Sequence, residues 1–216
     1  MKIKMIFLLL GFLVFGATSQ VLAQDPGPYL GISIGGQFLA PAQGEDQSGT
    51  FNLNYRSAPI GSVILGWELT PGSNIGEGRV ELEYSHRSNR FDTAEFTDGE
   101  VPAGGDLTAD SLLINTFGVY RSKSKWTPYL GIGLGAARIT AKDLTVTGQP
   151  LSNDDAIVFA YQIGGGVDLQ LSPAWTLDFG YRLFSTTKAK LAEANGDEFE
   201  TGYLSHILLV GLRFGF

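Results

Sequence analysis

The sequence predicts an all-β fold: an eight-stranded antiparallel up-and-down transmembrane β-barrel. Three observations predict it. Eight segments of the 216-residue chain alternate apolar residues with polar or small ones, the connections between them alternate between long and short, and the last strand ends on the aromatic residue Phe216. A period of two residues is the repeat of a β-strand. Closure into a barrel lets a sheet satisfy every backbone N–H and C=O group inside a lipid bilayer.

The N-terminus has the three parts of a secretory signal peptide. Lys2 and Lys4 give a positive start, an apolar run follows from Met5 to Ala17, and Ala23 ends a short segment of small and aliphatic residues. The apolar run has about 13 residues, fewer than the roughly 20 that a spanning helix needs. A retained membrane anchor is therefore the weaker alternative. The predicted domains are a signal peptide, 1–23, and a barrel domain, 24–216.

The first three predicted strands are 29–38, 62–69 and 79–86. Apolar residues occupy every second position of each strand except Gly36 and His86, and Gly, Ser, Gln or charged residues lie between them, with Ile64 as the one apolar exception. The third strand places Arg79, Glu81 and Glu83 on one face. Three charges on the inner face of one strand argue against the core of a soluble β-sandwich.

The fourth predicted strand, 111–121, leaves its outer face open. Leu112 and Ile114 compete with Leu113 and Phe117 for the lipid side. We place Asn115 and Arg121 on the inner side, because polar residues are expected to line the lumen of a membrane barrel.

The last four predicted strands are 129–138, 159–171, 175–184 and 203–216. Each alternates apolar residues with Gly or polar residues, and most of the eight strands are near the 9 to 11 residues that a tilted spanning strand needs.

The connections give an independent test of the strand assignment. Outer-membrane barrels have short periplasmic turns and longer extracellular loops, and an even strand number places both chain ends in the periplasm. Four long extracellular loops are therefore expected. The long connections are 39–61, 87–110, 140–158 and 185–202, and the short ones are 70–78, 122–125 and 172–174.

Three stretches resemble one family of proteins: WTPYLGIGLGAA (126–137), GGGVDLQLSPAWTLDFGYRLF (164–184) and the terminal GLRFGF. The chain is similar there to the small outer-membrane β-barrels of the OmpA/OmpX-like porin superfamily. The resemblance implies an outer-membrane location and a C-terminal strand that the barrel-assembly machinery recognises. That signal would consist of Gly211, Phe214 and Phe216, although Leu209 lies where the pattern has a polar residue.

An eight-stranded barrel is only wide enough for side chains to fill. Because isolated charges in a confined space are costly, we expect the inward charges to pair and to leave no wide channel. A narrow porin-like channel for ions or small solutes is the alternative. The predicted lumen charge network is Glu68, Arg79, Glu81, Glu83, Arg121, Asp168, Asp178, Arg182 and Arg213.

The predicted loops are acidic and polar, and function concentrates on loops that a rigid scaffold holds. We expect a role in envelope structure or surface interaction, with outer-membrane lipid, lipopolysaccharide, or a surface ligand or host molecule as partners. Charge runs on exposed segments most often only solvate them.

An enzyme is the remote alternative. The string His86-Arg87-Ser88-Asn89 matches the His-x-Ser-Asn string of lipid A deacylase barrels, and a Ser nucleophile needs a His base and an acid that orients it. Glu95, Asp98 or Glu100 could supply the acid. In that family, however, the string lies late in the chain, whereas here it lies in the third strand. We therefore expect no enzymatic activity.

Composition excludes other classes. The formal net charge is −7, or about −9 after removal of the signal peptide, and no basic stripe is present, so nucleic-acid binding is not expected. The chain has no cysteine, which excludes disulfides and thiolate metal sites. No metal cluster, phosphate loop or nucleotide motif occurs in the sequence, so no cofactor is expected.

Overall fold

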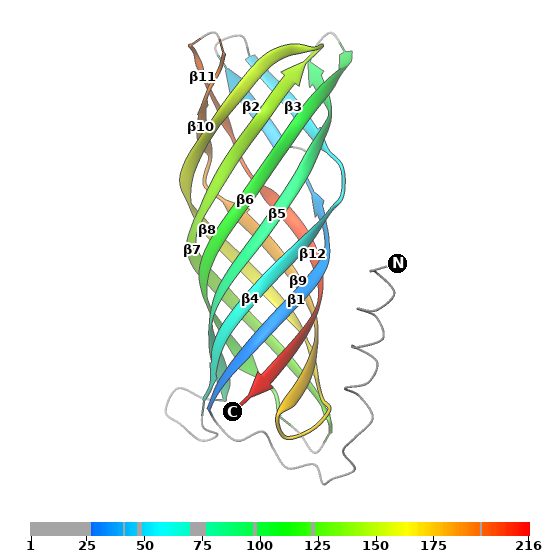
Figure 1. Cartoon of the computed structure of the whole chain (residues 1–216), viewed down its shortest axis with the longest axis vertical. Helices are drawn as coiled ribbons and strands as arrows, with labels where there is room; N and C mark the ends of the chain where they lie inside the picture. Colours follow the sequence, from blue (N-terminus) through cyan, green and yellow to red (C-terminus); the bar gives the residue numbers. More distant parts are fainter. Residues whose placement is uncertain are drawn as a thin grey trace, which may run out of the picture.

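The computed structural model describes residues 27–40, 42–46, 49–69, 77–96, 99–121, 124–194 and 196–216. The predicted signal peptide lies outside these residues. Tilted strands form a tall, closed cylinder (Figure 1). Within the described ranges, no helix is long and apolar enough to cross a membrane.

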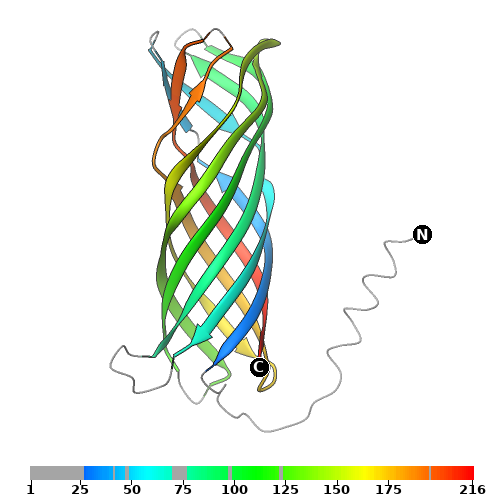
Figure 2. The same ribbon diagram turned by 60° about the vertical axis from the view of Figure 1, so that its left-hand side comes forward.

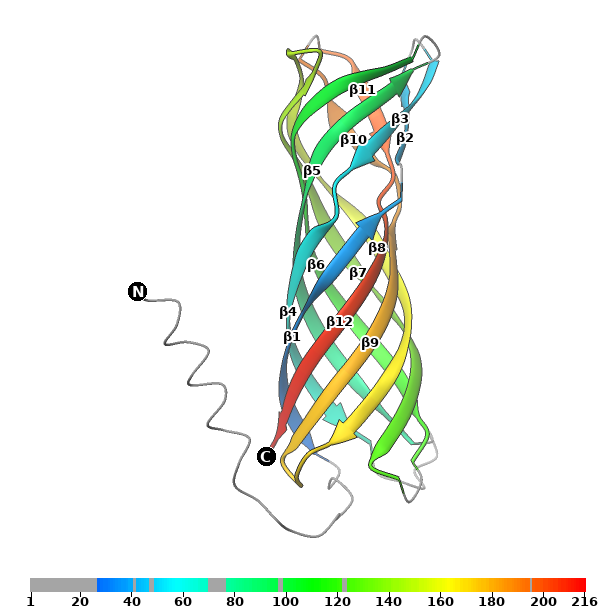
Figure 3. The same ribbon diagram turned by 90° about the vertical axis from the view of Figure 1, so that its right-hand side faces the viewer.

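Eight strands close a ring, which confirms the predicted barrel. Each is antiparallel to its neighbours, and the first strand pairs with the last from Tyr29↔Gly215 to Leu39↔Ser205. Figure 3 shows this closure, with β1 and β12 side by side. The ring strands are β1 (Pro28–Leu39), β4 (Ala58–Glu68), β5 (Gly78–Phe96), β6 (Gly99–Val119), β7 (Trp126–Val146), β8 (Gln149–Gln170), β9 (Trp175–Thr186) and β12 (Leu204–Gly215).

Four shorter strands build a second ring on top of the first. β5, β6, β7 and β8 have 19 to 22 residues and continue past their neighbours (Figure 2). The short strands fill the remaining places: β3 pairs with β5, β2 with β3 and β11, and β10 with β11. Directly after β10, the bridge Ser152↔Glu193 connects the chain to β8. The short strands are β2 (Ala42–Asp46), β3 (Gly49–Tyr55), β10 (Ala189–Ala192) and β11 (Glu198–Thr201).

We call the eight-stranded ring that holds the start of β1 and the end of β12 the lower tier. The four short strands, together with the far parts of β5 to β8, are the upper tier. The two tiers lie at opposite ends of the cylinder in Figure 1.

The prediction of four long loops is wrong. Most of 87–110 belongs to the hairpin of β5 and β6, and most of 140–158 to the hairpin of β7 and β8, which turns at Thr147 and Gly148. The other two long connections contain β2 with β3 and β10 with β11. The strands continue because their alternation continues, with the polarity of the two faces exchanged.

This exchange of polarity is clearest on β5 and its neighbour β6. In the lower tier β5 points Leu82 outward and Glu83 inward, whereas further along it points Arg90 outward and Phe91 inward. On β6, Ile114 is exposed in the lower tier and Leu107 is buried in the upper tier. The lower tier thus has an apolar exterior, as a lipid-embedded barrel requires, and the upper tier has the apolar interior of a water-soluble barrel.

The structure also shows which face of the fourth predicted strand points outward. Leu112 and Ile114 are 52% and 64% exposed on the outer face of β6, while Leu113 and Phe117 are buried inside with Asn115. Lumen-facing apolar residues are therefore part of this barrel's packing.

One apolar cluster fills the upper tier and reaches into the top of the lower tier. Every member is less than 9% exposed. Its residues are Leu53, Ile60, Phe91, Ala94, Leu107, Ala109, Leu113, Ala137, Ile139, Ala141, Leu144, Ala160, Phe184, Ala189, Leu191, Phe199, Tyr203, Ile207 and Leu209.

Candidate functional site

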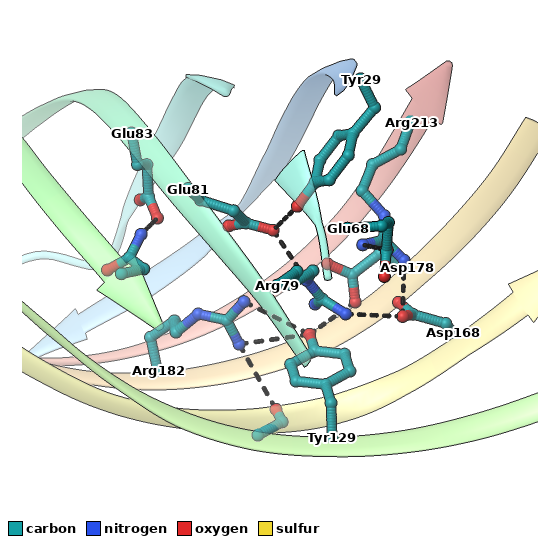
Figure 4. A network of polar contacts seen from close by, with 12 residues as sticks. Tyr29, Glu68, Arg79, Glu81, Glu83, Tyr129, Asp168, Asp178, Arg182 and Arg213 are labelled. Atoms are coloured by element: carbon teal, nitrogen blue, oxygen red, sulfur yellow. Dashed lines mark hydrogen bonds and ion pairs between the residues drawn. The ribbon is translucent and has the colours of Figure 1, made fainter. Parts of the chain in front are cut away.

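The lower tier encloses a lumen of charged side chains. The structure places all nine predicted lumen residues there, and adds Arg87, which the sequence analysis assigned to a loop. Five arginines thus face five carboxylates, so the formal charge of the lumen is balanced. Most of the members are drawn in Figure 4. The ten residues are Glu68, Arg79, Glu81, Glu83, Arg87, Arg121, Asp168, Asp178, Arg182 and Arg213.

Arg79 lies at the centre of this network and is fully buried. Its Nε donates to Glu81 Oε1 at 2.8 Å, and its Nη1 donates to Asp168 Oδ2 at 2.7 Å. The guanidinium also lies over the ring of Tyr129, 4.1 Å from the ring centroid. Two carboxylates and an aromatic face replace the water that a buried cation loses.

The ion pairs continue from Asp168 toward the lower end of the barrel. Arg213 Nη2 lies 2.5 Å from Asp168 Oδ2, and Arg213 Nη1 lies 3.4 Å from Glu68 Oε1. Glu68 also accepts a hydrogen bond from Arg121 Nη2 at 2.5 Å. Acids and bases therefore alternate along a chain that links β5, β8, β12, β4 and the end of β6, as Figure 4 shows for its central part.

Two tyrosines that the sequence analysis left out complete the network. Tyr29 OH donates to Glu81 Oε1 at 2.6 Å, and Tyr129 OH donates to Asp178 Oδ1 at 2.6 Å. Tyr129 OH also accepts a hydrogen bond from Arg182 Nη1 at 3.2 Å. Both tyrosines share the parity of the inward residues on their strands, and this signal could have identified them.

Four of the ten charges have no ion-pair partner. Within the described part of the chain, no oppositely charged group lies within 4.0 Å of Glu83, Arg87, Asp178 or Arg182. Neutral donors hold Glu83: it accepts hydrogen bonds from Ser85, Asn115 and Gln162. Arg87 Nη1 donates to Ser111 Oγ, and its guanidinium lies 3.9 Å from the ring centroid of Phe184.

Glycines on the inner face make room for these large side chains. A Cβ atom at Gly66 would lie 2.1 Å from the ring of Tyr29, and one at Gly164 would lie 2.2 Å from Arg182 Cδ. The high glycine content of the strands thus reflects the narrowness of the barrel.

The barrel geometry agrees with the comparisons with known proteins. The family model for the outer membrane protein beta-barrel domain matches residues 7–216. The chain belongs to this family. It is an integral protein of the outer membrane, as the sequence predicted.

Among curated proteins, the chain is similar to Putative adhesin RP828 of Rickettsia prowazekii (strain Madrid E), with 28% identity over 153 residues. The match covers 68% of this chain and 66% of that relative, so the chain spans slightly less than two thirds of the relative's length.

Among solved structures, the outer membrane protein OprG from Pseudomonas aeruginosa superposes with a TM-score of 0.54 at 15% identity, over 88% of this chain and 97% of OprG. Neisserial surface protein A gives a TM-score of 0.49 at 16% identity, over 88% of this chain and 97% of that chain. The likeness to OprG supports the fold.

Membership of this family orients the barrel. Both chain ends of an even-stranded outer-membrane barrel lie in the periplasm. The lower tier is therefore the part in the membrane, and the upper tier lies outside the cell.

Paired charges cover the outside of the upper tier. Arg138 holds Asp155 through two hydrogen bonds of 2.9 Å, and Arg56 Nη2 lies 2.7 Å from Asp92 Oδ1. The hydrogen bond from Arg138 is the largest cause that lowers the pKa of Asp155 below its ordinary value. Asp155 is therefore ionised at neutral pH, and such charged pairs give the upper tier a solvated exterior.

His86 and Ser88, the two residues that suggested an enzyme, lie on the outer face of β5, next to the apolar band. His86 Nδ1 lies 2.8 Å from Asp110 Oδ1, so Asp110 takes the place that was expected for Glu95, Asp98 or Glu100; of these, Asp98 lies outside the described residues. Asp110 Oδ1 also accepts a hydrogen bond from Tyr84 OH at 2.8 Å. Ser88 is exposed on the same face and makes no hydrogen bond with His86 among the described contacts.

The predicted assembly residues lie at the end of β12. Phe214 and Phe216 are exposed on the lipid-facing side, and the ring of Phe214 lies 4.8 Å from that of Trp175. Gly211 faces inward, where an added Cβ would just contact Asp178 Cβ at 3.4 Å.

Proposed function

We propose that this protein is a closed, non-conducting outer-membrane barrel whose upper tier presents a rigid surface to molecules outside the cell. The observation that supports this proposal is the exchange of polarity along β5 to β8, from an apolar exterior in the lower tier to an apolar interior in the upper tier. A barrel that served only to span the membrane would not need a second ring with its own apolar core.

The upper tier holds this surface well away from the lipid. β8 has 22 residues; at roughly 3.3 Å per residue and a tilt of about 40°, such a strand rises roughly 55 Å. The apolar band of an outer-membrane barrel is only about 25 Å tall. The remaining roughly 30 Å is enough to cross the headgroup layer and reach partners beyond it.

The charged pairs of the upper tier and the similarity to a relative named as an adhesin indicate what this surface contacts. The charged pairs of the upper tier, such as Arg138 with Asp155, begin directly above the apolar band and suit the polar lipopolysaccharide layer. The rickettsial relative is named as an adhesin, and its likeness favours contact with a surface ligand or host molecule. Envelope structure and surface interaction are both served by one rigid platform.

Cell binding tests this proposal. Bacteria that display the wild type should bind host cells or an immobilised matrix several-fold above an empty-vector control. A variant that neutralises outward carboxylates of the upper tier, with Asp92→Asn, Asp106→Asn and Asp155→Asn, should lose most of this binding. Leu65→Ile, on the lipid face of the lower tier, is the matched control and should bind as the wild type does. Folded, displayed wild type that binds no better than the vector would refute the surface role.

The closed lumen follows from the paired charges and from the apolar cluster above them. The alternative, a narrow channel for ions or small solutes, is favoured by buried polar atoms of the lumen that have no protein partner among the described residues, such as Arg79 Nη2 and Asp168 Oδ1. Planar-bilayer recording separates the two, because a channel would give steady conductance and a closed barrel none.

We also propose that Gly211, Phe214 and Phe216 are read by the barrel-assembly machinery, and that residues 1–23 are removed as a signal peptide. The proposed role is not enzymatic. Mass spectrometry of lipid A from cells with the wild type or with Ser88→Ala tests this point: acyl loss that depends on Ser88 would contradict it.

A further inference from the structure

The interior of the barrel changes character along its length. The lower tier is lined by the charged network around Arg79, and the upper tier by the apolar cluster that includes Leu107 and Phe199. We propose that the apolar cluster, and not the ion-pair network, is the barrier to water and ions, so that the lower tier is a hydrated well open only to the periplasm. This inference rests on the proposed closed barrel.

The buried polar atoms show that the lower tier needs water. Among the described residues, twelve buried side-chain nitrogen and oxygen atoms have no protein partner, and all but Tyr55 OH belong to residues of the lower tier. They include Glu81 Oε2, Arg87 Nη2 and Arg213 Nε. Buried polar groups without a protein partner are normally satisfied by ordered water, because an unmade hydrogen bond is costly.

The network can be reached from the periplasmic end. Arg121, which pairs with the buried Glu68 at this end, has a side chain that is 23% exposed. A surface depression lies beside Arg121, and its lining combines Glu77 with the outward-facing Tyr120 and Leu130. Through Arg121 the network therefore meets solvent on the side of the chain ends.

Among the residues that the structure describes, the interior of the upper tier is lined by apolar side chains. The core residues Leu107 and Ile139 come from the neighbouring strands β6 and β7, Leu191 comes from β10, and each is at most 1% exposed. Below them Phe184 and Leu113 continue the same cluster into the top of the lower tier. Water and ions leave narrow apolar constrictions, and this dewetting closes pores.

The two possible barriers respond differently to mutation. If ion pairs closed the barrel, Glu68→Gln, which weakens the contacts of Glu68 with Arg121 and Arg213, or Asp168→Asn would open it. If the apolar cluster closes it, these variants stay silent, whereas Leu107→Ser combined with Leu191→Ser admits water and ions.

Planar-bilayer recording of the full mature chain, with folding checked on a heat-modifiability gel, tests the inference. We expect no steady conductance above the baseline of the bilayer from the wild type, Glu68→Gln or Asp168→Asn. From the double serine variant we expect a conductance about tenfold above this bilayer baseline. A silent wild type with conducting Glu68→Gln or Asp168→Asn would overturn the inference and leave the closed barrel intact. A folded but silent double serine variant would also overturn it. A conducting wild type would instead refute the proposed closed barrel.

A second measurement decides the matter if the double serine variant does not fold. Water-edited NMR of the labelled wild type in bilayers should show rapid transfer from water to the guanidinium groups of Arg79 and Arg213, and none to the methyl groups of Leu107 and Ile139. Transfer to both sets, or to neither, would contradict a hydrated well below an apolar barrier.

Discussion

Arg79 Nη1 and Asp168 Oδ2 lie 2.7 Å apart inside the lumen, although 89 residues separate them in the sequence. This pair joins β5 to β8 across the barrel and lies in the middle of the alternating chain of charges. Its burial makes it a sensitive probe of what the network contributes.

Arg79→Met should destabilise the barrel by about 3–5 kcal/mol, because Glu81 and Asp168 would each lose a buried partner. Urea unfolding in lipid vesicles, followed by tryptophan fluorescence, measures the change. Arg56→Met is the matched control: Arg56 pairs with Asp92 in the exposed upper tier, where loss of the pair should cost about 0–1 kcal/mol. Equal losses for the two variants would show that the network does not stabilise the lower tier.

Gly66→Ala should destabilise the barrel by about 1–3 kcal/mol, since the added Cβ would overlap the ring of Tyr29 and disturb its hydrogen bond to Glu81. The measurement is the temperature at which the folded band disappears from a heat-modifiability gel. Gly36→Ala serves as the control, because nothing lies within 4 Å of its added Cβ. If both variants melt as the wild type does, the tight packing of Tyr29 is not important for stability.

Thr147→Asn should stabilise the hairpin of β7 and β8 by about 0.5–1 kcal/mol. Thr147 has a φ of 51°, a left-handed conformation that a β-branched residue adopts at a cost and that Asn tolerates. Urea unfolding measures the gain. The same change at Thr145, whose φ is not positive, should bring no gain, and an equal gain there would rule out relief of strain as the cause.

Phe216→Ala should lower the amount of folded protein in the outer membrane several-fold without a matching loss of stability for barrels refolded in vitro, because the proposed signal acts during assembly. Membrane fractionation with a heat-modifiability gel measures the amount. Leu212→Ala, on the same lipid-facing side of β12, controls for lost apolar contact. Normal assembly of the Phe216 variant would remove this residue from the signal.

The lower tier could be predicted because lipid on one side and a narrow lumen on the other impose strict alternation. On β5 the apolar residues alternate with charged ones, so only the apolar face can point toward lipid. The apolar residues are Val80, Leu82 and Tyr84, and the charged ones are Arg79, Glu81 and Glu83. The upper tier was missed because its exterior is polar. Further along β5, Arg90 points outward and Phe91 points inward, the opposite of the apolar exterior and polar interior that identified the strand a few residues earlier. The segment was therefore assigned to a loop.

The choice of partners within the network could not be predicted. Alternation places Glu83 inside the barrel, but the stagger of the ring decides what it meets across the lumen, and it meets Asn115 and Gln162 in place of an arginine. Tyr29 and Tyr129 were predictable from parity alone. Arg87 would have followed as well, had the alternation of Glu83 and Ser85 been continued by one more inward position.

The pairing of β1 with β12 brings Tyr29 level with Gly215, nearly the whole described chain away. No earlier segment can serve as a substitute for that last strand, so the cylinder cannot close before β12 has been made. Until β12 has paired with β1, the sheet has two open edges and an apolar outer face without lipid around it. Open edges and apolar faces promote aggregation, so the interval before closure is when this protein is most prone to aggregate.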